Sequence, residues 1–92
     1  MGIGMIFISL GKFRKKPTKD MTDKVGKLTV EMAQKEGIKI LSFYWTLGRY
    51  DTVVTMEAAD EKAAMKMNLM VSDFVSTQTM VAIPREQAIK LV

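Results

Sequence analysis

The sequence contains neither cysteine nor histidine. Without cysteine the chain can form no disulfide and no thiolate metal site. Without histidine it can form no Ser-His-Asp or Cys-His nucleophile, and the usual zinc and non-haem iron sites are excluded as well. Any catalysis must therefore rest on Asp, Glu, Lys, Arg or Tyr side chains or on a bound cofactor. We expect no metal site and no cofactor.

Long apolar segments and targeting signals are also missing. The apolar run over residues 1–8 is far too short to span a bilayer. Basic residues follow this run instead of preceding it, and no small-residue cleavage site comes after it, so it does not resemble a signal peptide. Gly2 and Gly4 lie at the start of a predicted strand and do not lead into a helix, which excludes a phosphate-binding glycine loop. We expect a cytoplasmic protein that does not contact a membrane.

The chain is short, with 92 residues, of which 48% are hydrophobic and 26% are charged. These values are ordinary for a soluble globular domain, and the length predicts one domain over residues 1–92. A chain of this size buries only about 60–65% of the surface that its unfolded form exposes. Self-association is the remaining way to bury more apolar surface.

The net charge of +4 is distributed unevenly. Residues 12–27 contain seven basic residues and only two acidic ones, and the rest of the chain is close to neutral. Such a cluster could attract nucleic acid or an anionic substrate. The simpler interpretation is a solvated loop and helix surface that keeps the protein soluble, and this is the interpretation that we favour.

Hydrophobic periodicity predicts elements in the order β-α-β-β-α-β, followed by a short helix. In the first helix Met21, Val25, Leu28 and Met32 recur at helical spacing. Gly37 is expected to end that helix, and Asp60 is a good N-cap for the second. The predicted strands cover residues 3–10, 38–47, 51–58 and 75–83, the helices cover 18–36, 60–74 and 84–92, and residues 11–17 are predicted to be a loop.

This order is that of a ferredoxin-like α+β fold, βαββαβ, with a four-stranded antiparallel sheet and two helices on one face. Right-handed crossovers place both helices on the same side, and the strand order 4-1-3-2 follows. Strand alternation in the second strand places Ile40, Ser42 and Tyr44 on one face, and Phe43 and Trp45 on the other.

The face of the sheet without helices is expected to be apolar. We predict that Met5 and Phe7 lie there, together with aromatic residues of the second strand. An exposed patch of this kind is larger than monomers usually show, and a second copy in a symmetric dimer is its simplest cover. A reader of single-stranded RNA needs exposed aromatic residues on the two inner strands, and here only Phe7 is offered, so nucleic-acid binding is the weaker interpretation.

The hairpin between the second and third strands carries a family resemblance. Residues 44–51 contain the element Gly48-Arg49-Tyr50-Asp51, which resembles the Gly-x-Tyr-Asp signature of the GYD domain family. The similarity extends over roughly residues 37–83, through Val53-Val54, Glu57-Ala58, Asp60-Glu61, Ala63-Ala64 and the strand from Val75 to Thr79.

The resemblance implies a small protein of the dimeric α+β barrel type, and it implies no particular reaction. The chain departs from the family pattern in two places. The basic segment 11–17 stands where the family tends to have a short loop with Thr and Gly, and Asp73-Phe74 stands where a glycine often precedes the last strand.

The residues around the hairpin are also the candidate site. Gly48 is expected to shape the turn. Tyr50 and Asp51 are candidate catalytic residues, as proton donor and general base, although Asp51 could simply accept backbone hydrogen bonds in the turn. Tyr44, Trp45, Arg49 and Lys12 are candidate ligand-binding residues.

Two functions follow from these residues. The first is a homodimer or higher homo-oligomer that binds a small molecule in a cavity or at the dimer interface, in a regulatory or accessory role. The alternative is a cofactor-independent enzyme that acts on an aromatic or enolisable metabolite through Asp51 and Tyr50.

Overall fold

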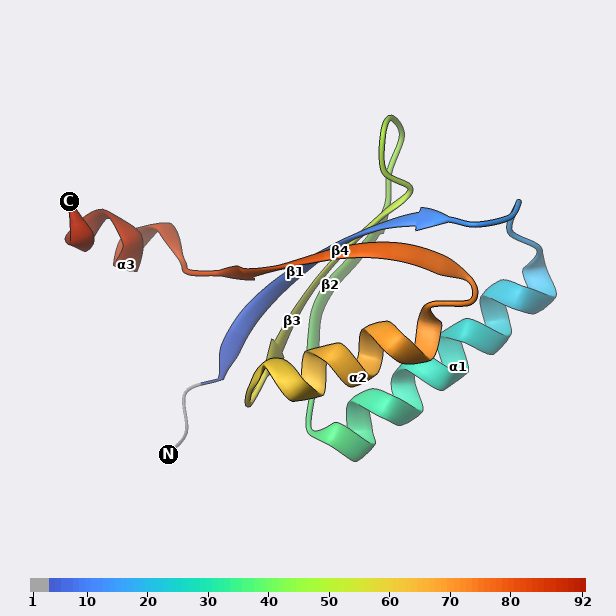
Figure 1. The fold of residues 1–92 in the computed structure, drawn as a ribbon, viewed down its shortest axis with the longest axis horizontal. Coiled ribbons are helices and arrows are strands. Elements are labelled where there is room, and N and C mark those ends of the chain that lie inside the picture. Colours follow the sequence, from blue (N-terminus) through green and yellow to red (C-terminus); the bar gives the residue numbers. More distant parts are fainter. Residues whose placement is uncertain (1–3) are drawn as a thin grey trace.

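The computed structural model describes residues 4–92. Four strands and two long helices make up the body of the protein, and a short helical segment follows the last strand (Figure 1). The elements are β1 (Met5–Phe13), α1 (Lys19–Glu36), β2 (Lys39–Trp45), β3 (Thr52–Ala58), α2 (Glu61–Val71), β4 (Val75–Ala82), α3 (Arg85–Ala88) and the 3-10 turn η1 (Ile89–Leu91).

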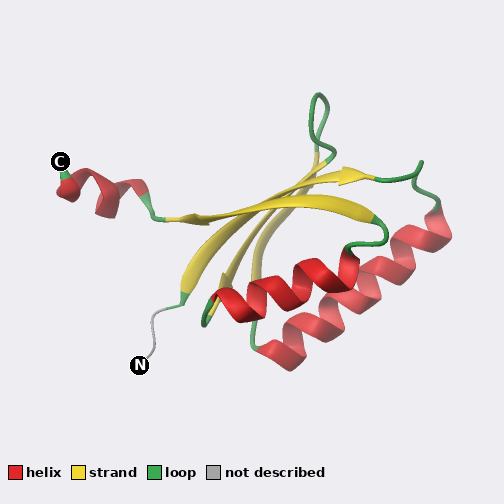
Figure 2. Ribbon diagram, in the orientation of Figure 1, coloured by secondary structure: helices red, strands yellow, loops and turns green. Residues whose placement is uncertain are grey.

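The sheet has the order β2-β3-β1-β4 with all neighbours antiparallel, which confirms the predicted topology. Helices α1 and α2 both lie on one face of the sheet, and no helix within residues 4–92 covers the opposite face (Figure 2). We call these the helix face and the outer face. No helix within residues 4–92 is long and apolar enough to cross a membrane.

The helix ends follow the sequence closely. The Thr18 hydroxyl accepts a hydrogen bond from the Met21 N–H and caps α1. Gly37 ends α1 with φ of 68°, the left-handed conformation that a glycine adopts without a Cβ penalty. Asp60 caps α2 through the Ala63 N–H. Helix α2 ends at Val71, three residues earlier than the apolar periodicity predicts, and Phe74 lies in the turn that follows.

Strand β1 is longer than predicted, because residues 11–13 continue it and only the residues after Phe13 form a loop. Gly11 pairs with Thr52 on one side and with Thr77 on the other. A Cβ at Gly11 would collide with the Thr52 hydroxyl and approach Val75 to 2.9 Å, so the ladder continues only because this residue is glycine. The prediction of a loop over residues 11–17 is therefore wrong at its start.

Strand β2 contains a bulge at Leu41 that strict alternation does not anticipate. Ile40 lies opposite Met56, while Ser42 lies opposite Thr55, so the register shifts by one residue between them. A one-residue shift moves every following side chain to the other face. Ile40 and Ser42 therefore point to opposite faces, and the predicted grouping of these two residues is wrong.

The buried apolar set is small and rich in alanine. Phe7, Met56 and Met67 are its largest members, and four alanines contribute most of the remainder. Phe7 is only 3% exposed and lies on the helix face, as does Met5, so the prediction that both occupy the outer face is wrong. The reason is the parity of the pairing, since Phe7 lies opposite the core residue Met56.

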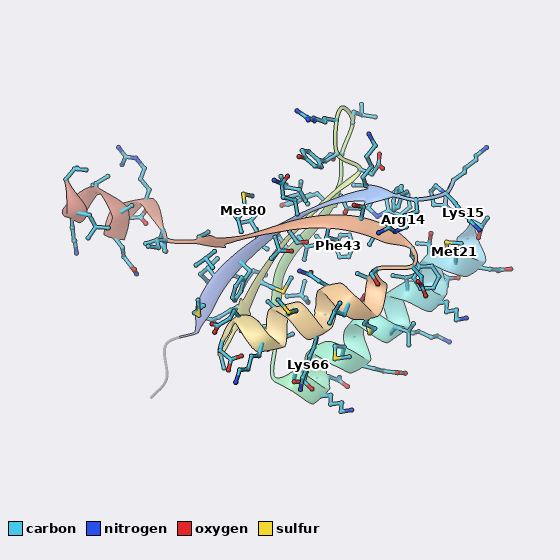
Figure 3. The ribbon with its side chains drawn as sticks, viewed as in Figure 1. Arg14, Lys15, Met21, Phe43, Lys66 and Met80 are labelled. Atoms are coloured by element: carbon cyan, nitrogen blue, oxygen red, sulfur yellow. The ribbon has the colours of Figure 1, made fainter. Side chains whose placement is uncertain are left out.

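The centre of the outer face is nevertheless apolar. Its central row consists of Ile6, Ile8 and Leu10 of β1, with Val53 of β3 beside Tyr44, and Met80 of β4 on the other side. Figure 3 shows Met80 on this side of the sheet and Phe43 on the helix side. Tyr44 and Met80 are 64% and 42% exposed, respectively.

The chain after β4 leaves the body of the protein. Helix α3 and the turn η1 lie at the opposite end of the molecule from the start of α1 (Figure 1). Ile83, Ile89 and Leu91 are all exposed there. The predicted terminal helix is thus present in shortened form, and its apolar residues are not buried by this chain.

Candidate functional site

A cavity of about 380 Å³ lies between the helix face of the sheet and the two helices. Its deepest residues are buried, with Met56 at 2% and Met67 at 4% exposure. Its lining is mainly apolar, and among the described residues Lys15 is the one charged side chain that contributes to it. A volume of this size is at the lower end of the range typical of small-molecule sites.

Aromatic side chains surround the opening of the cavity. Phe43 and Trp45 of the edge strand β2 line it, and both are about half exposed. The Phe13 ring meets Trp45 edge-to-face with centroids 5.1 Å apart, a favourable aromatic arrangement. Phe74 contributes from the turn after α2. The opening therefore presents flat apolar surfaces to solvent.

Helix α1 supplies the wall opposite β2. Met21 and Val25, two residues of the apolar stripe predicted for this helix, line the cavity together with Thr29, which the prediction did not include. Gly26 also lines the cavity, and a Cβ built there would meet no atom within 4 Å. This glycine therefore makes no close helix-to-sheet contact, and it leaves the opening unobstructed.

The base of the cavity carries a chain of hydrogen bonds between three elements. The Asn68 side-chain amide of α2 donates to the Thr79 hydroxyl of β4 over 2.8 Å. The Thr79 hydroxyl in turn donates to the Ser9 hydroxyl of β1 over 3.1 Å. Ser9 is 5% exposed, and both Ser9 and Asn68 line the cavity. Polar groups thus meet an otherwise apolar interior at one defined place.

Asp51 stabilises the end of the sheet. Its carboxylate accepts the Phe13 N–H over 2.8 Å, and its own N–H donates to the Gly11 carbonyl over 2.8 Å. These bonds hold the last residues of β1 beside the turn and fix the ring of Phe13 against Trp45. The geometry is that of a structural acceptor, the second of the two roles considered for this residue.

The turn before Asp51 is held by backbone and side-chain hydrogen bonds. Thr46 donates from its N–H to the Asp51 carbonyl and from its hydroxyl to the Tyr50 carbonyl. Gly48 has φ of 103°, a conformation that other residues rarely adopt, so the turn requires glycine at this position.

The other predicted site residues lie away from the cavity. Tyr50 donates its hydroxyl to the Gln78 side chain over 2.7 Å, at the outer face. Tyr44 and Lys12 also lie on the outer face, and Arg49 is exposed in the turn between β2 and β3. Of the predicted ligand-binding and catalytic residues, Trp45 alone lines the cavity. The described residues contain no cluster of three or more acidic side chains that could hold a metal ion.

Several cavity residues were not anticipated from the sequence. Phe43 and Trp45 share a face with Ile40 only because of the bulge at Leu41, which no sequence pattern marks. Ser9 is different, since a serine inside an apolar strand is a visible signal for a buried polar contact. Asn68 lies on the cavity side of an otherwise apolar helix stripe and gives a similar signal.

The fold and the cavity together define a ferredoxin-like α+β protein with an apolar pocket between its layers. The family model of the GYD domain matches residues 7–92, which is nearly the whole chain. The chain therefore belongs to the GYD domain family, and the resemblance noted at the hairpin is confirmed.

The fold is also similar to that of a solved structure. It is described as the structure of B. subtilis LrpC, and it superposes with a TM-score of 0.70 at 14% sequence identity. The similarity covers 91% of this chain and 54% of that chain, so this chain spans about half the length of LrpC. At this identity the likeness concerns the fold alone. No curated protein sequence matches the chain.

Proposed function

We propose that this protein is a homo-oligomeric domain that binds a small apolar molecule in the cavity between the sheet and the helices. The observation that carries the proposal is the cavity itself, which is about 380 Å³ in volume and opens beside two half-exposed aromatic side chains. Sites that bind small molecules are typically apolar clefts of about 300–1,000 Å³ with a few polar groups in the lining. An apolar cavity of this size is therefore best understood as space for a ligand.

We assign the protein a regulatory or accessory role. The cavity lining offers hydroxyls, one amide and one lysine, and no carboxylate among the described residues. The candidate acid and base, Tyr50 and Asp51, are hydrogen-bonded to Gln78 and to the backbone of Phe13 outside this lining. The geometry thus favours binding over the alternative of cofactor-independent catalysis. The expected cytoplasmic location and the single domain over residues 1–92 remain parts of the proposal.

Self-association is supported by the outer face. Its central apolar row has no helix of residues 4–92 above it (Figure 2), and the segment after β4 carries further exposed apolar residues. A second copy placed face to face would cover the central row and these exposed residues. An RNA-stacking surface is not supported, because the outer face of the two inner strands carries no aromatic residue.

Two variants test the cavity. The probe 8-anilinonaphthalene-1-sulfonate fluoresces strongly when it enters an apolar site, and we expect the wild-type protein to enhance its emission. Gly26→Leu places a side chain at the opening, where no atom lies within 4 Å, and should reduce this emission without loss of stability. Lys27→Leu adds the same side chain at the next position of α1, which does not line the cavity, and is the matched control. Equal emission from the two variants would contradict the proposed site.

A third variant tests the assembly. Ile8→Lys places a charge in the centre of the outer face, where a dimer would bury it, and burial of an unpaired charge is costly. We expect light scattering to find a dimer or larger oligomer for the wild type and a folded monomer for the variant. Glu31→Lys, on the exposed side of α1, should leave the oligomer intact. A wild-type monomer at micromolar concentration would overturn the assembly.

A further inference from the structure

The direction of the hydrogen bonds at the base of the cavity specifies what kind of ligand fits there. The Asn68 nitrogen can only donate, so the Thr79 oxygen is the acceptor in the bond that joins them. The Thr79 proton is then free to donate to Ser9, and the Ser9 oxygen is the acceptor in the second bond. Each hydroxyl carries a single proton, so the direction set by Asn68 passes along the chain.

Ser9 is the last residue of this series of hydrogen bonds, and it lies where the series meets the cavity. Its oxygen is occupied as an acceptor, and the hydrogen bonds of residues 4–92 give its proton no acceptor. Only 5% of the surface of Ser9 is exposed, and the residue lines the cavity. A buried donor without an acceptor is unfavourable, and an oxygen atom of a bound molecule would satisfy it.

The surroundings of Ser9 add to this preference. Gly11 follows two residues later on the same face, and the threonines paired with it, Thr52 and Thr77, both line the cavity. The Thr52 hydroxyl fills the space beside Gly11, so hydroxyl groups of neighbouring strands contribute to this part of the lining as well. The apolar walls supplied by Met21, Met67 and Trp45 face this polar base from the other directions.

We propose that the cavity binds a flat apolar molecule carrying a carbonyl or carboxylate oxygen, and that the Ser9 hydroxyl donates a hydrogen bond to this oxygen. This inference rests on the proposed binding function and adds the chemical class of the ligand. The aromatic residues at the opening favour an aromatic body, since rings pack on them with little loss of conformational entropy. The relay from Asn68 through Thr79 holds Ser9 in the donating orientation before the ligand arrives.

A matched pair of probes tests the inference. Benzophenone and diphenylmethane have the same two rings and differ in one group, a carbonyl against a methylene. Trp45 is the single tryptophan of the chain, so its indole N–H gives one signal in a proton–nitrogen correlation spectrum of the labelled protein. Titration of this signal reports occupancy of the cavity with either probe.

We expect the wild type to bind benzophenone about five- to tenfold more tightly than diphenylmethane, as one net hydrogen bond predicts. Ser9→Ala should remove the preference and leave diphenylmethane binding unchanged, while Ser76→Ala, on the outer face of β4, should keep it. The same spectra show whether each variant is folded.

The outcomes separate the two proposals. Equal binding of both probes by the wild type overturns the assignment of Ser9 as a donor and leaves the cavity as a binding site, and this comparison requires no variant. A preference that persists in folded Ser9→Ala also overturns the assignment. Absence of any change in the Trp45 signal with either probe counts against the cavity as a binding site, and thus against both proposals.

Discussion

Asp51 offers the sharpest test of whether the hairpin is structural or catalytic. Its carboxylate accepts the Phe13 N–H over 2.8 Å in a partly buried setting and holds the end of β1 in the sheet. A hydrogen bond to a charged group contributes about 1.5–3 kcal/mol to stability, and an unsatisfied buried N–H costs a similar amount. Because water can partly reach Asp51, we expect Asp51→Ala to lower the free energy of unfolding by about 2 kcal/mol.

A second substitution of Asp51 separates the contribution of its charge from that of its hydrogen bond. Asp51→Asn keeps an oxygen that can accept the Phe13 N–H but loses the charge, so we expect a loss of about 1 kcal/mol. For a domain of this size each kcal/mol lowers the melting temperature by about 4–8 °C. The order wild type, Asn, Ala should therefore be resolved by thermal unfolding at one fixed protein concentration, since self-association makes the melting temperature depend on it.

Hydrogen exchange localises the effect. The Phe13 amide should exchange faster in Asp51→Ala, whereas amides in the centre of β3 should change only with global stability. Asp73→Ala, at an exposed aspartate in the turn after α2, is the control and should stay within about 0.5 kcal/mol of the wild type. If Asp51→Ala is as stable as this control, the structural role is refuted. An Asp51→Asn variant that loses a measured activity with unchanged stability would instead support catalysis.

Three further predictions concern stability. Gly26→Ala should raise the free energy of unfolding by about 0.5–1 kcal/mol in urea titrations, because alanine favours the helix and the added Cβ meets no atom within 4 Å. A lower free energy of unfolding would mean that α1 packs more closely against its surroundings at this position. Gly11→Ala should cost about 1–3 kcal/mol through its collision with the Thr52 hydroxyl. Adding Thr52→Ala should recover part of that loss, and strict additivity of the two changes would argue against the collision. Tyr50→Phe should cost less than about 1 kcal/mol, because its bond to Gln78 is exposed to competing water; a larger loss would indicate that Tyr50 is a structural anchor comparable to Asp51.

The arrangement of the elements could be predicted from local signals. Gly37, Asp60 and Gly48 each mark a boundary through a requirement of the backbone, and the periodicity of α1 identifies the side that faces the sheet. With two crossovers of fixed handedness, these boundaries leave one reasonable strand order. The family signature at residues 48–51 lies at the hairpin for the same reason, since its glycine and aspartate both shape the turn.

The site could be predicted only in part, because it depends on register. The bulge at Leu41 decides that Phe43 and Trp45 line the cavity while Tyr44 does not, and a bulge arises from pairing with β3. The continuation of β1 through Gly11 likewise depends on Thr52, Thr77 and Asp51, which are distant in sequence. Non-local contacts of this kind leave no periodic trace in either strand alone.

Native mass spectrometry of the gently purified protein tests both the homo-oligomer and the ligand in its cavity, because it reports the number of chains and any retained small molecule together. We expect an even-numbered homo-oligomer whose mass exceeds that of its chains by the mass of a small apolar molecule, which is released on denaturation. A bare monomer at micromolar concentration would contradict both the covered outer face and the occupied cavity.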